Sequence, residues 1–314
     1  MEPLKRKISR IIKNKALELG FSDCGFAPAV RLNADAERLR KWLDEGLHAG
    51  MGYMENHFEE RVDPEKLLSG TKSVIIVLMN YFTEEEIFSE NDNFIISKYA
   101  YGNDYHFVLK EKLNMLFTFI KSNVSSLEGR IFVDSAPVLE RSLAALAGLG
   151  WIGKNTNLIS PKYGSFIFLG EILVNIELDY GTQLPDYCGG CTKCIQACPT
   201  GAIVDSRKID SNKCISYLTI ENKGDISNEF TGKLKNRIFG CDICQDVCPW
   251  NRKSEINTVD NFQPKPDLVG MTKSDWQKLT KEKFLTLFKN SAVKRAGYKG
   301  LKRNVDFVSQ NQAG

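Results

Sequence analysis

The chain has 314 residues, of which 42% are hydrophobic and 26% are charged, and its formal net charge is +3. This length can form one large domain and a smaller one around a sizeable core, and the composition excludes disordered and fibrous classes. The longest apolar run, residues 73–79, is too short to cross a bilayer, and the basic N-terminus lacks the apolar core of a signal peptide. We therefore expect a cytoplasmic protein without a membrane partner.

Helix and strand signals alternate along the first 180 residues. Apolar residues at helical spacing, some with a capping residue or a closing glycine, predict helices at residues 3–20, 35–46, 103–122 and 138–150. Short β-branched runs predict strands at residues 21–28, 73–82 and 129–134, and one or two more within 164–178. This pattern is typical of an α/β or α+β domain with a mostly buried sheet. From about Asp179 the sequence changes to loops and short turns rich in cysteine.

The spacing of the cysteines is the strongest chemical signal. Eight of the nine cysteines lie between residues 188 and 248, and seven of these form two runs that each end in Cys-Pro. The runs are Cys188, Cys191, Cys194 and Cys198, followed by Cys241, Cys244 and Cys248. Ile238 stands where the second run lacks its first cysteine, and Cys214 can supply the missing thiolate. A run of four closing on Cys-Pro is typical of bacterial ferredoxins, in which the fourth cysteine binds the other cubane.

On this pattern the eight thiolates form two sets of four, each for one 4Fe–4S cluster. The sets are Cys188, Cys191, Cys194 and Cys248, and Cys198, Cys214, Cys241 and Cys244. Zinc is the weaker alternative because it usually takes two separated pairs, and a reducing cytosol disfavours disulfides. Clusters with a purely structural role are a further alternative. The ninth cysteine, Cys24, lies in an apolar stretch and is predicted to be a core residue.

Three other motifs need to be weighed. Residues 148–154 match G-x-G-x-x-G, but they follow a predicted helix rather than a strand, so we interpret them as a glycine-rich turn close to a cofactor. Asp104 and His106 match the start of a D-x-H-x-x-G cobalamin motif, yet Leu109 replaces the glycine, and a capped helix start explains them better. Asp134 ends a predicted strand, where a carboxylate either faces a site or caps the next helix.

The C-terminal part is basic. Residues 271–305 contain ten Lys or Arg and only two Asp or Glu. Both a solvated helical face and contact with phosphates fit this excess of positive charge.

Several of these stretches together resemble the epoxyqueuosine reductase family. They are VDSAPVLERSLAALAGLGWIGKNTNLI, CGGCTKCIQACPTGAI, CISYLT and NRIFGCDICQDVCPWN, with a late Arg303–Asn304. The resemblance runs through nearly all of the chain. It implies reduction of epoxyqueuosine to queuosine at the wobble position of tRNA, the last step of queuosine biosynthesis. The implied cofactors are cobalamin and two 4Fe–4S clusters, and the implied partners are the tRNA anticodon stem-loop and an external electron donor.

The resemblance also assigns site residues. The family's proton donor maps onto Asp134, and a carboxyl with a raised pKa beside a dry cofactor can protonate an epoxide oxygen as it leaves. Segments that line the corrin in the family match this sequence at Arg61, Lys154, Leu158, Ser216, Lys223 and Asp242, in addition to Asp134. A family position that can carry cysteine falls near Ser97, so a thiol role is in doubt there.

The implied organisation is α+β. Residues 1–180 form a cobalamin-binding catalytic α/β domain, residues 181–255 a bacterial-ferredoxin-like domain with two 4Fe–4S clusters, and residues 256–314 a basic helical segment. Many family members continue into helical repeats that help to hold tRNA. This sequence stops at Gly314, so the resemblance assigns tRNA recognition to the core and the basic segment. The alternatives are a corrinoid reductase of a small halogenated or oxygenated compound and an electron-carrier module.

Overall fold

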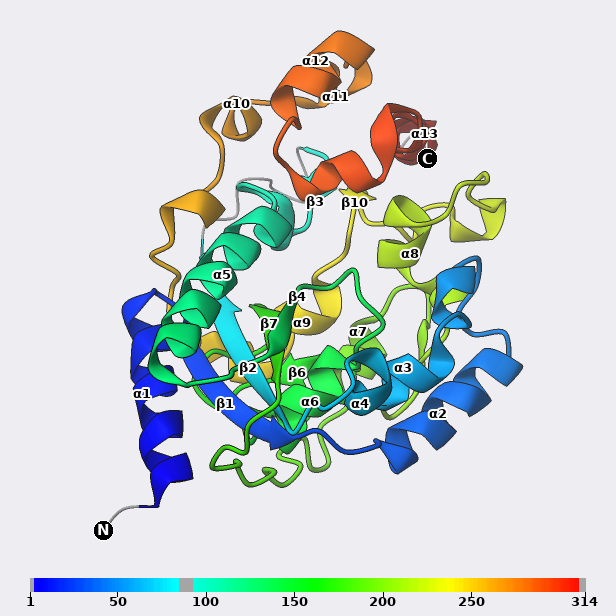
Figure 1. The fold of residues 1–314 in the computed structure, drawn as a ribbon. Coiled ribbons are helices and arrows are strands. Elements are labelled where there is room, and N and C mark those ends of the chain that lie inside the picture. Colours follow the sequence, from blue (N-terminus) through cyan, green and yellow to red (C-terminus); the bar gives the residue numbers. More distant parts are fainter. Residues whose placement is uncertain (1–2, 85–92, 311–314) are drawn as a thin grey trace.

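The computed structural model describes residues 3–84 and 93–310, and a four-stranded sheet lies at its centre (Figure 1). Across the sheet the strands are β1 (Asp23–Pro28), β2 (Ser73–Asn80), β7 (Ile167–Val174) and β4 (Gly129–Phe132). All three pairings are antiparallel. This pairing is typical of α+β folds, because the central sheet of an α/β domain is mostly parallel.

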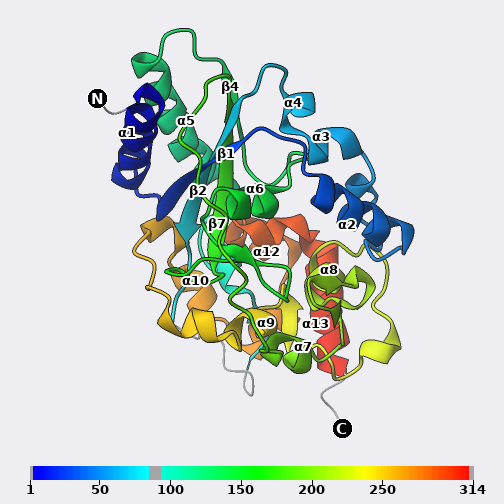
Figure 2. The same ribbon diagram turned by 90° about the horizontal axis from the view of Figure 1, so that it is seen from below.

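Helices cover both faces of this sheet. α1 (Leu4–Glu18) and α5 (Tyr105–Asn123) cover one face, and α6 (Glu140–Leu146) covers the other (Figure 2). All eight residues of β2 are buried, which explains why its sequence is a continuous apolar run. In β7 the side chains alternate, so that Ile172 and Val174 pack with α1 and α5, whereas Leu169 and Leu173 pack on the α6 side.

Short elements flank the sheet. α2 (Asn33–Asp44), α3 (Phe58–Val62) and α4 (Pro64–Leu67) lie between β1 and β2 in the chain, and α2 and α3 share a small apolar cluster. The hairpin of β5 (Trp151–Ile152) and β6 (Leu158–Ile159) follows α6. Its residues Trp151 and Ile159 pack against Cys188 and Cys248, so the hairpin joins the sheet to the cysteine-rich segment.

The cysteine-rich segment contains helices of four to six residues. α7 (Lys193–Ala197) and α9 (Ile243–Asp246) lie side by side, and each belongs to one of the two cysteine runs (Figure 2). Between them come the hairpin of β8 (Ile203–Asp205) and β9 (Lys208–Ile209) and then α8 (Ile215–Ile220). The two runs are therefore adjacent in space although about fifty residues separate them.

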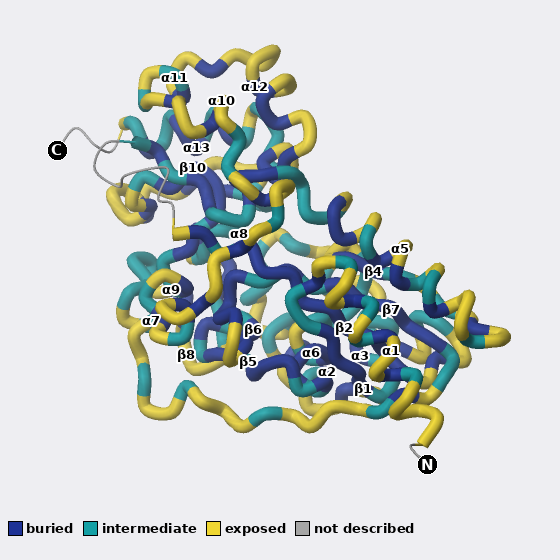
Figure 3. The backbone as a smooth tube through the Cα atoms, turned by 90° about the vertical axis from the view of Figure 1, so that its left-hand side faces the viewer, coloured by how far each residue is buried: buried dark blue, intermediate teal, exposed yellow. Residues whose placement is uncertain are grey.

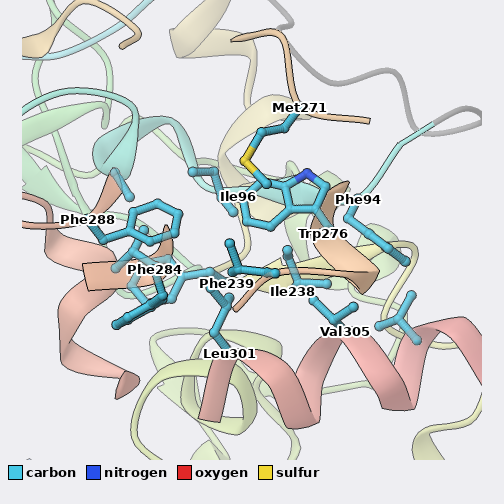
Figure 4. Close-up of a cluster of buried hydrophobic side chains, with 14 of the residues drawn as sticks. Phe94, Ile96, Ile238, Phe239, Met271, Trp276, Phe284, Phe288, Leu301 and Val305 are labelled. Atoms are coloured by element: carbon cyan, nitrogen blue, oxygen red, sulfur yellow. The ribbon is translucent and has the colours of Figure 1, made fainter. Parts of the chain in front are cut away.

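A second hydrophobic core lies outside the sheet (Figure 4). It is formed by α10 (Pro266–Val269), α11 (Lys273–Gln277), α12 (Lys281–Leu287) and α13 (Gly297–Gln310), with α8 and the parallel pair β3 (Ile95–Ile96) and β10 (Arg237–Phe239). The largest fully buried side chain, Trp276, is part of this core. Figure 3 shows buried residues in both the sheet region and this second core. The basic C-terminal segment is thus packed against α8 and β10 of the cysteine-rich segment and against β3 from the N-terminal part.

Every helix and strand predicted before residue 180 is confirmed, with ends that differ by a few residues. Two details differ. β4 ends at Phe132, so Asp134 lies in the loop that follows, and residues 164–178 contain one long strand, β7. Cys24 is 1% exposed, which confirms it as a core residue. Within the described residues, no helix combines the length and the apolarity needed to cross a membrane.

Candidate active site and cluster ligands

Asp134 is held in a strained turn between β4 and α6. Its φ is 53°, and the Ser135 N–H donates to the Val133 carbonyl at 2.5 Å, so the chain reverses within three residues. A positive φ is uncommon for a residue with a side chain and is often found at functional sites. The Asp134 N–H donates to Glu140 Oε1 at 2.6 Å, which anchors the turn to the first residue of α6.

Two residues at the start of α5 bind the Asp134 carboxylate. Its Oδ2 accepts a hydrogen bond from the Tyr105 hydroxyl at 2.9 Å and lies 3.1 Å from His106 Nε2. Asp104 caps α5 with its side chain, and its Oδ1 lies 2.7 Å from His106 Nδ1. The imidazole is therefore fixed between two carboxylates, with one ring nitrogen directed at each.

These contacts place a proton on His106 rather than on Asp134. Burial alone would lower the pKa of His106, but its bonds to Asp104 and Asp134 outweigh burial and raise that pKa to about 9. Burial alone would raise the pKa of Asp134, but the bonds from His106 and Tyr105 outweigh it and lower that pKa. The Asp134 side chain is still 55% exposed, which weakens the effect of burial. The sequence-based expectation of a raised pKa for Asp134 is therefore wrong in the protein without a bound cofactor or substrate.

The first group of neighbouring thiols joins the two cysteine runs. Burial raises the pKa of both Cys194 and Cys248, and the charge of the nearby Cys188 raises each of them further. The charge of Cys248 also raises the pKa of Cys194, and the charge of Cys191 raises the pKa of Cys248. The last cysteine of the second run is therefore a neighbour of the first three cysteines of the first run.

The second group is made of the remaining four thiols. Burial raises the pKa of Cys214, Cys241 and Cys244, in each case as the largest effect. Charges of neighbouring thiolates also raise these pKa values. Cys198 raises the pKa of Cys214, and Cys214 raises those of Cys241 and Cys244. Cys241 also raises the pKa of Cys244. The charge of Cys194, from the first group, also raises the pKa of Cys244, so the two groups lie next to each other.

The surroundings of the sulfurs suit iron–sulfur clusters. Among residues 3–84 and 93–310, no three His, Cys, Asp or Glu side chains converge closely enough to hold one metal ion. The thiolates of a cubane are spread more widely because each one binds a different iron. The indole N–H of Trp151 lies 3.5 Å from Cys188 Sγ, and the Ala202 N–H lies 3.3 Å from Cys198 Sγ. Such donors stabilise thiolates and tune cluster potentials.

The residues predicted to line the corrin come from several elements. They are Arg61 on α3, Lys154 and Leu158 at the β5–β6 hairpin, Ser216 on α8, Lys223 in the loop after α8, and Asp242 just before α9. In the described structure, none of them makes a hydrogen bond or an ion pair with Asp134, Tyr105 or His106. Their connections to the site are indirect.

Arg61 is the one with an unused donor. It is half-buried, its Nη2 donates to the Tyr53 carbonyl at 3.1 Å, and its buried Nε finds no partner among the described residues. Burial lowers the pKa of Arg61 and raises that of Tyr53. The charges of Glu221 and Asp134 also raise the pKa of Tyr53, whereas the charge of Arg295 lowers it. α3, the Asp134 turn, the end of α8 and the C-terminal segment therefore all come near Tyr53.

The β5–β6 hairpin and Asp242 lie beside the cysteines. Lys154 Nζ donates to the Gly189 carbonyl at 2.7 Å, and Leu158 is buried. Arg141 on α6 donates to the Thr156 carbonyl at 2.9 Å, and its charge is among the causes that lower the pKa of Asp134. Asp242 is buried, and its Oδ2 accepts the Lys98 N–H at 2.8 Å.

Sequence reasoning missed part of this site. Asp104 was interpreted as a helix cap, which is confirmed, but the two residues after it also bind Asp134. The D-x-H pattern was the only local signal for His106. Tyr105 had no signal of its own. Arg295 and Glu221, which form a two-pronged ion pair at 2.9 and 3.2 Å, are separated by 74 residues in sequence.

The ten cations of residues 271–305 are not equivalent. Arg303 donates to the carbonyls of Leu218, Asn222 and Gly224, and Lys302 binds the Gln277 carbonyl and Asp306. These two cations, like Arg295, hold the fold together. Other lysines of the stretch are exposed, namely Lys278, Lys281, Lys283, Lys289, Lys294 and Lys299.

Two family models match the chain. Residues 61–135 match the model of epoxyqueuosine reductase QueG (DUF1730), and residues 187–251 match a 4Fe-4S double cluster binding domain. The second match contains all eight clustered cysteines.

Similar proteins carry the same family name. An epoxyqueuosine reductase of Cellulophaga algicola is 50% identical over 304 residues, which are 97% of this chain and 99% of that protein. A crystal structure of epoxyqueuosine reductase with an epoxyqueuosine-modified tRNA-Tyr stem loop has a TM-score of 0.89 at 30% identity, over 96% of this chain and 80% of that one. A Bacillus subtilis epoxyqueuosine reductase, whose catalytic aspartate loop is swung out of the active site, has the same TM-score and identity, over 96% of this chain and 81% of that one.

A more distant likeness concerns the fold alone. The catabolic reductive dehalogenase NpRdhA matches with a TM-score of 0.51 at 14% identity, over 98% of this chain and 36% of that one. It shows that the arrangement of elements is shared with that class of reductase.

Proposed function

Because the chain belongs to the epoxyqueuosine reductase family, it is an oxidoreductase that reduces epoxyqueuosine to queuosine in tRNA, and we propose that it does so with two 4Fe–4S clusters and a cobalamin. One observation carries this proposal. The fold brings the Asp134 carboxylate within 3.1 Å of His106 Nε2, and the eight thiols of residues 188–248 lie close enough for their charges to shift one another's pKa values.

The proposed ligands of the first cluster are Cys188, Cys191, Cys194 and Cys248, and those of the second are Cys198, Cys214, Cys241 and Cys244. The mutual effects of the thiols on their pKa values support these two sets. The Trp151 and Ala202 donors give one further contact to a sulfur in each set. An external electron donor supplies the electrons that the clusters pass on.

The space bordered by Tyr53, Arg61 and Asp134 is the proposed site of cobalamin. The buried Nε of Arg61 without a partner is a donor that a polar edge of the macrocycle can satisfy. The hairpin with Lys154 and Leu158, together with Ser216, Lys223 and Asp242, would form the remaining wall. When bound, cobalamin supplies the reducing centre for the carbon–oxygen bond.

The protein's own side chains supply the protons that this reaction consumes. The reaction breaks both carbon–oxygen bonds of the epoxide, forms a carbon–carbon double bond and releases water, so it consumes two electrons and two protons. We assign to Asp134 the transfer of a proton to the leaving oxygen, and to His106 Nε2, 3.1 Å away, the reloading of Asp134. Covering the half-exposed carboxylate removes solvent and raises its pKa, which favours that transfer.

The state of His106 should set the alkaline limit of activity. Its pKa is about 9, so it is protonated at neutral pH, and kcat/KM should fall as the pH rises through that value. In His106→Gln this limb should disappear, with turnover at pH 7 lower by about tenfold or more. His48→Gln is the control, because His48 pairs with Glu55 and has no contact with Asp134 among the described hydrogen bonds and ion pairs, so this variant should keep the alkaline limb. A limb near pH 9 that persists in His106→Gln would assign it to another group.

Residues at the rim of the site are the proposed tRNA contacts. The Asn290 carbonyl accepts hydrogen bonds from the Asp104 N–H at 2.9 Å and from Lys265 Nζ at 3.2 Å, so residues 289–295 lie beside the start of α5. Lys289 and Lys294 are exposed at this rim. Their charges can neutralise phosphates of the anticodon stem-loop.

Changing these two lysines should weaken tRNA binding. The double variant Lys289→Gln, Lys294→Gln is expected to lower affinity and to reduce the slope of log Kd against log salt by about 0.7–0.9 for each lost phosphate contact. The matched control is Lys281→Gln, Lys283→Gln on α12, which removes the same charge from exposed positions in a different turn. Equal slopes in the two double variants would show that general charge, not this rim, binds tRNA.

Reconstitution tests the function as a whole. The protein is loaded with iron, sulfide and cobalamin under anaerobic conditions, given a strong reductant, and incubated with tRNA that carries epoxyqueuosine. We expect queuosine in the nuclease digest. Full cluster and corrin loading without conversion would overturn the proposal. Dehalogenation of a small aromatic compound without tRNA turnover would favour the corrinoid-reductase alternative, and electron transfer alone would favour the carrier.

A further inference from the structure

A pair of carboxyl groups, Glu171 fully buried and Glu140 partly buried, lies behind the Asp134 turn. Glu171 is at the middle of β7, is 0% exposed, and faces the α6 side of the sheet, because it alternates with Leu169 and Leu173. Neither of its side-chain oxygens makes a hydrogen bond of ordinary geometry among the described residues. A fully buried glutamate in the central sheet, with an apolar helix above it, calls for a physical explanation.

Its neighbour is Glu140, the first residue of α6. Burial raises the pKa of Glu171 well above its usual range, and the charge of Glu140 together with a loose hydrogen bond between the two carboxyl groups raises it further. These effects all favour the protonated form of Glu171. Burial and the charge of Asp134 raise the pKa of Glu140 to about 7, against the lowering effects of the Asp134 N–H, Arg141 and Glu171.

Glu140 is also the anchor of the Asp134 turn. Its Oε1 accepts the Asp134 N–H at 2.6 Å, and the turn has a φ of 53° at Asp134. An ionised oxygen is a stronger acceptor than a protonated one, so this bond is strongest when Glu140 has lost its proton. The other titratable groups near this pair are Arg141 on α6 and, across the turn, Tyr105 on α5.

We infer that Glu140, supported by Glu171, is a positioning residue that holds the Asp134 turn in its site-facing conformation, and that the proton shared by this carboxyl pair sets how firmly the turn is held. This inference rests on the proposed role of Asp134. The swung-out catalytic aspartate loop of the Bacillus subtilis relative is a second position of such a loop, and it is what loss of an anchor would permit here.

The pH dependence follows from the sign of the titration. Above about pH 7 Glu140 is ionised and the turn is held; as the pH falls through that value, Glu140 binds a proton and the hold weakens. Turnover should therefore show an acid limb near pH 7. KM should change less than kcat, because the turn presents the proton donor rather than the tRNA surface.

Substitutions separate this role from a structural one. Glu140→Gln keeps an acceptor for the Asp134 N–H but cannot titrate, so kcat at pH 8 should fall about tenfold and the acid limb should vanish. In Glu140→Ala, which has no acceptor for the Asp134 N–H, kcat should be lower than in Glu140→Gln. Glu171→Gln keeps a neutral donor toward Glu140 and should preserve the limb. Glu171→Leu removes that donor and should move the limb to higher pH.

Infrared spectroscopy tests the proton directly on the reconstituted protein. A carboxylic acid band should titrate near pH 7 in the parent and in Asp134→Asn, with a lowered midpoint in the latter because the neighbouring charge is gone, and should be absent from Glu140→Gln. An unchanged band or an unchanged acid limb in Glu140→Gln would overturn the inference. Because the band does not depend on turnover, full activity of Asp134→Asn would remove the donor role of Asp134 while leaving the titration of the pair intact.

Discussion

Replacing Asp134 by asparagine is expected to lower turnover of epoxyqueuosine at least about a hundredfold, while both clusters and cobalamin remain bound. Asparagine has the same shape, and its amide oxygen can still accept the Tyr105 hydroxyl, which binds Asp134 at 2.9 Å in the parent. It cannot carry a proton from His106 to the leaving oxygen. The change therefore removes the proposed proton transfer and little else.

The measurement is single-turnover conversion of modified tRNA by protein whose iron and corrin contents match those of the parent. Ser135→Ala is the matched control, because Ser135 lies in the same tight turn and its hydroxyl bonds only to the Val133 carbonyl, at 3.2 Å, among the described contacts. It should stay within about threefold of the parent. If Asp134→Asn also stays within that range, proton delivery must come from another group.

The asparagine variant should also change His106. Asp104 and Asp134 both raise the pKa of this histidine, to about 9 in the parent. With Asp134 neutral, one of these two causes is lost, so the pKa should move toward the ordinary value near 6.5. Nuclear magnetic resonance of the imidazole measures this shift without any turnover. An unchanged His106 pKa would mean that the two side chains do not interact in solution.

The features that sequence reasoning predicted best are those whose physical cause lies within a short stretch. The buried run of β2 and the cap at Asp104 are local patterns, and both are found in the structure. The cysteine pattern is local as well, because a proline and fixed spacings make the chain turn after each run. Such patterns need no knowledge of what lies elsewhere in the fold.

The parts that could not be predicted depend on contacts between distant segments. The lowered pKa of Asp134 requires His106, 28 residues away, and the raised pKa of Glu140 requires its own burial and the nearby charge of Asp134. In the sequence Glu171 is one acidic residue in an apolar strand, where an exposed edge position is the ordinary expectation. Likewise Arg303 belongs to a basic stretch by composition, yet it bonds to the backbone carbonyls around α8.

Two double substitutions should distinguish the possible ways of dividing the eight cysteines. In the proposed arrangement Cys188 and Cys248 bind the same cluster, so changing both to alanine should remove that cluster and leave the other unaltered, with iron falling from about eight to about four per chain. Changing Cys188 and Cys198 to alanine removes the same number of thiolates, but one from each set. Both clusters should then lose a ligand, and no unaltered cluster should remain.

If each run instead served its own cluster, these two outcomes would be exchanged, because Cys188 and Cys198 would share one cluster. Iron analysis and electron paramagnetic resonance of the reduced proteins measure the difference, since an intact cluster keeps its signal and loses only its interaction with the second. The division matters physically. Cys194 lies in the first turn of α7 and Cys198 directly follows this helix, so if they bind different clusters, a helix of five residues fixes how close the two clusters lie. An unaltered cluster in the Cys188, Cys198 variant would contradict that arrangement.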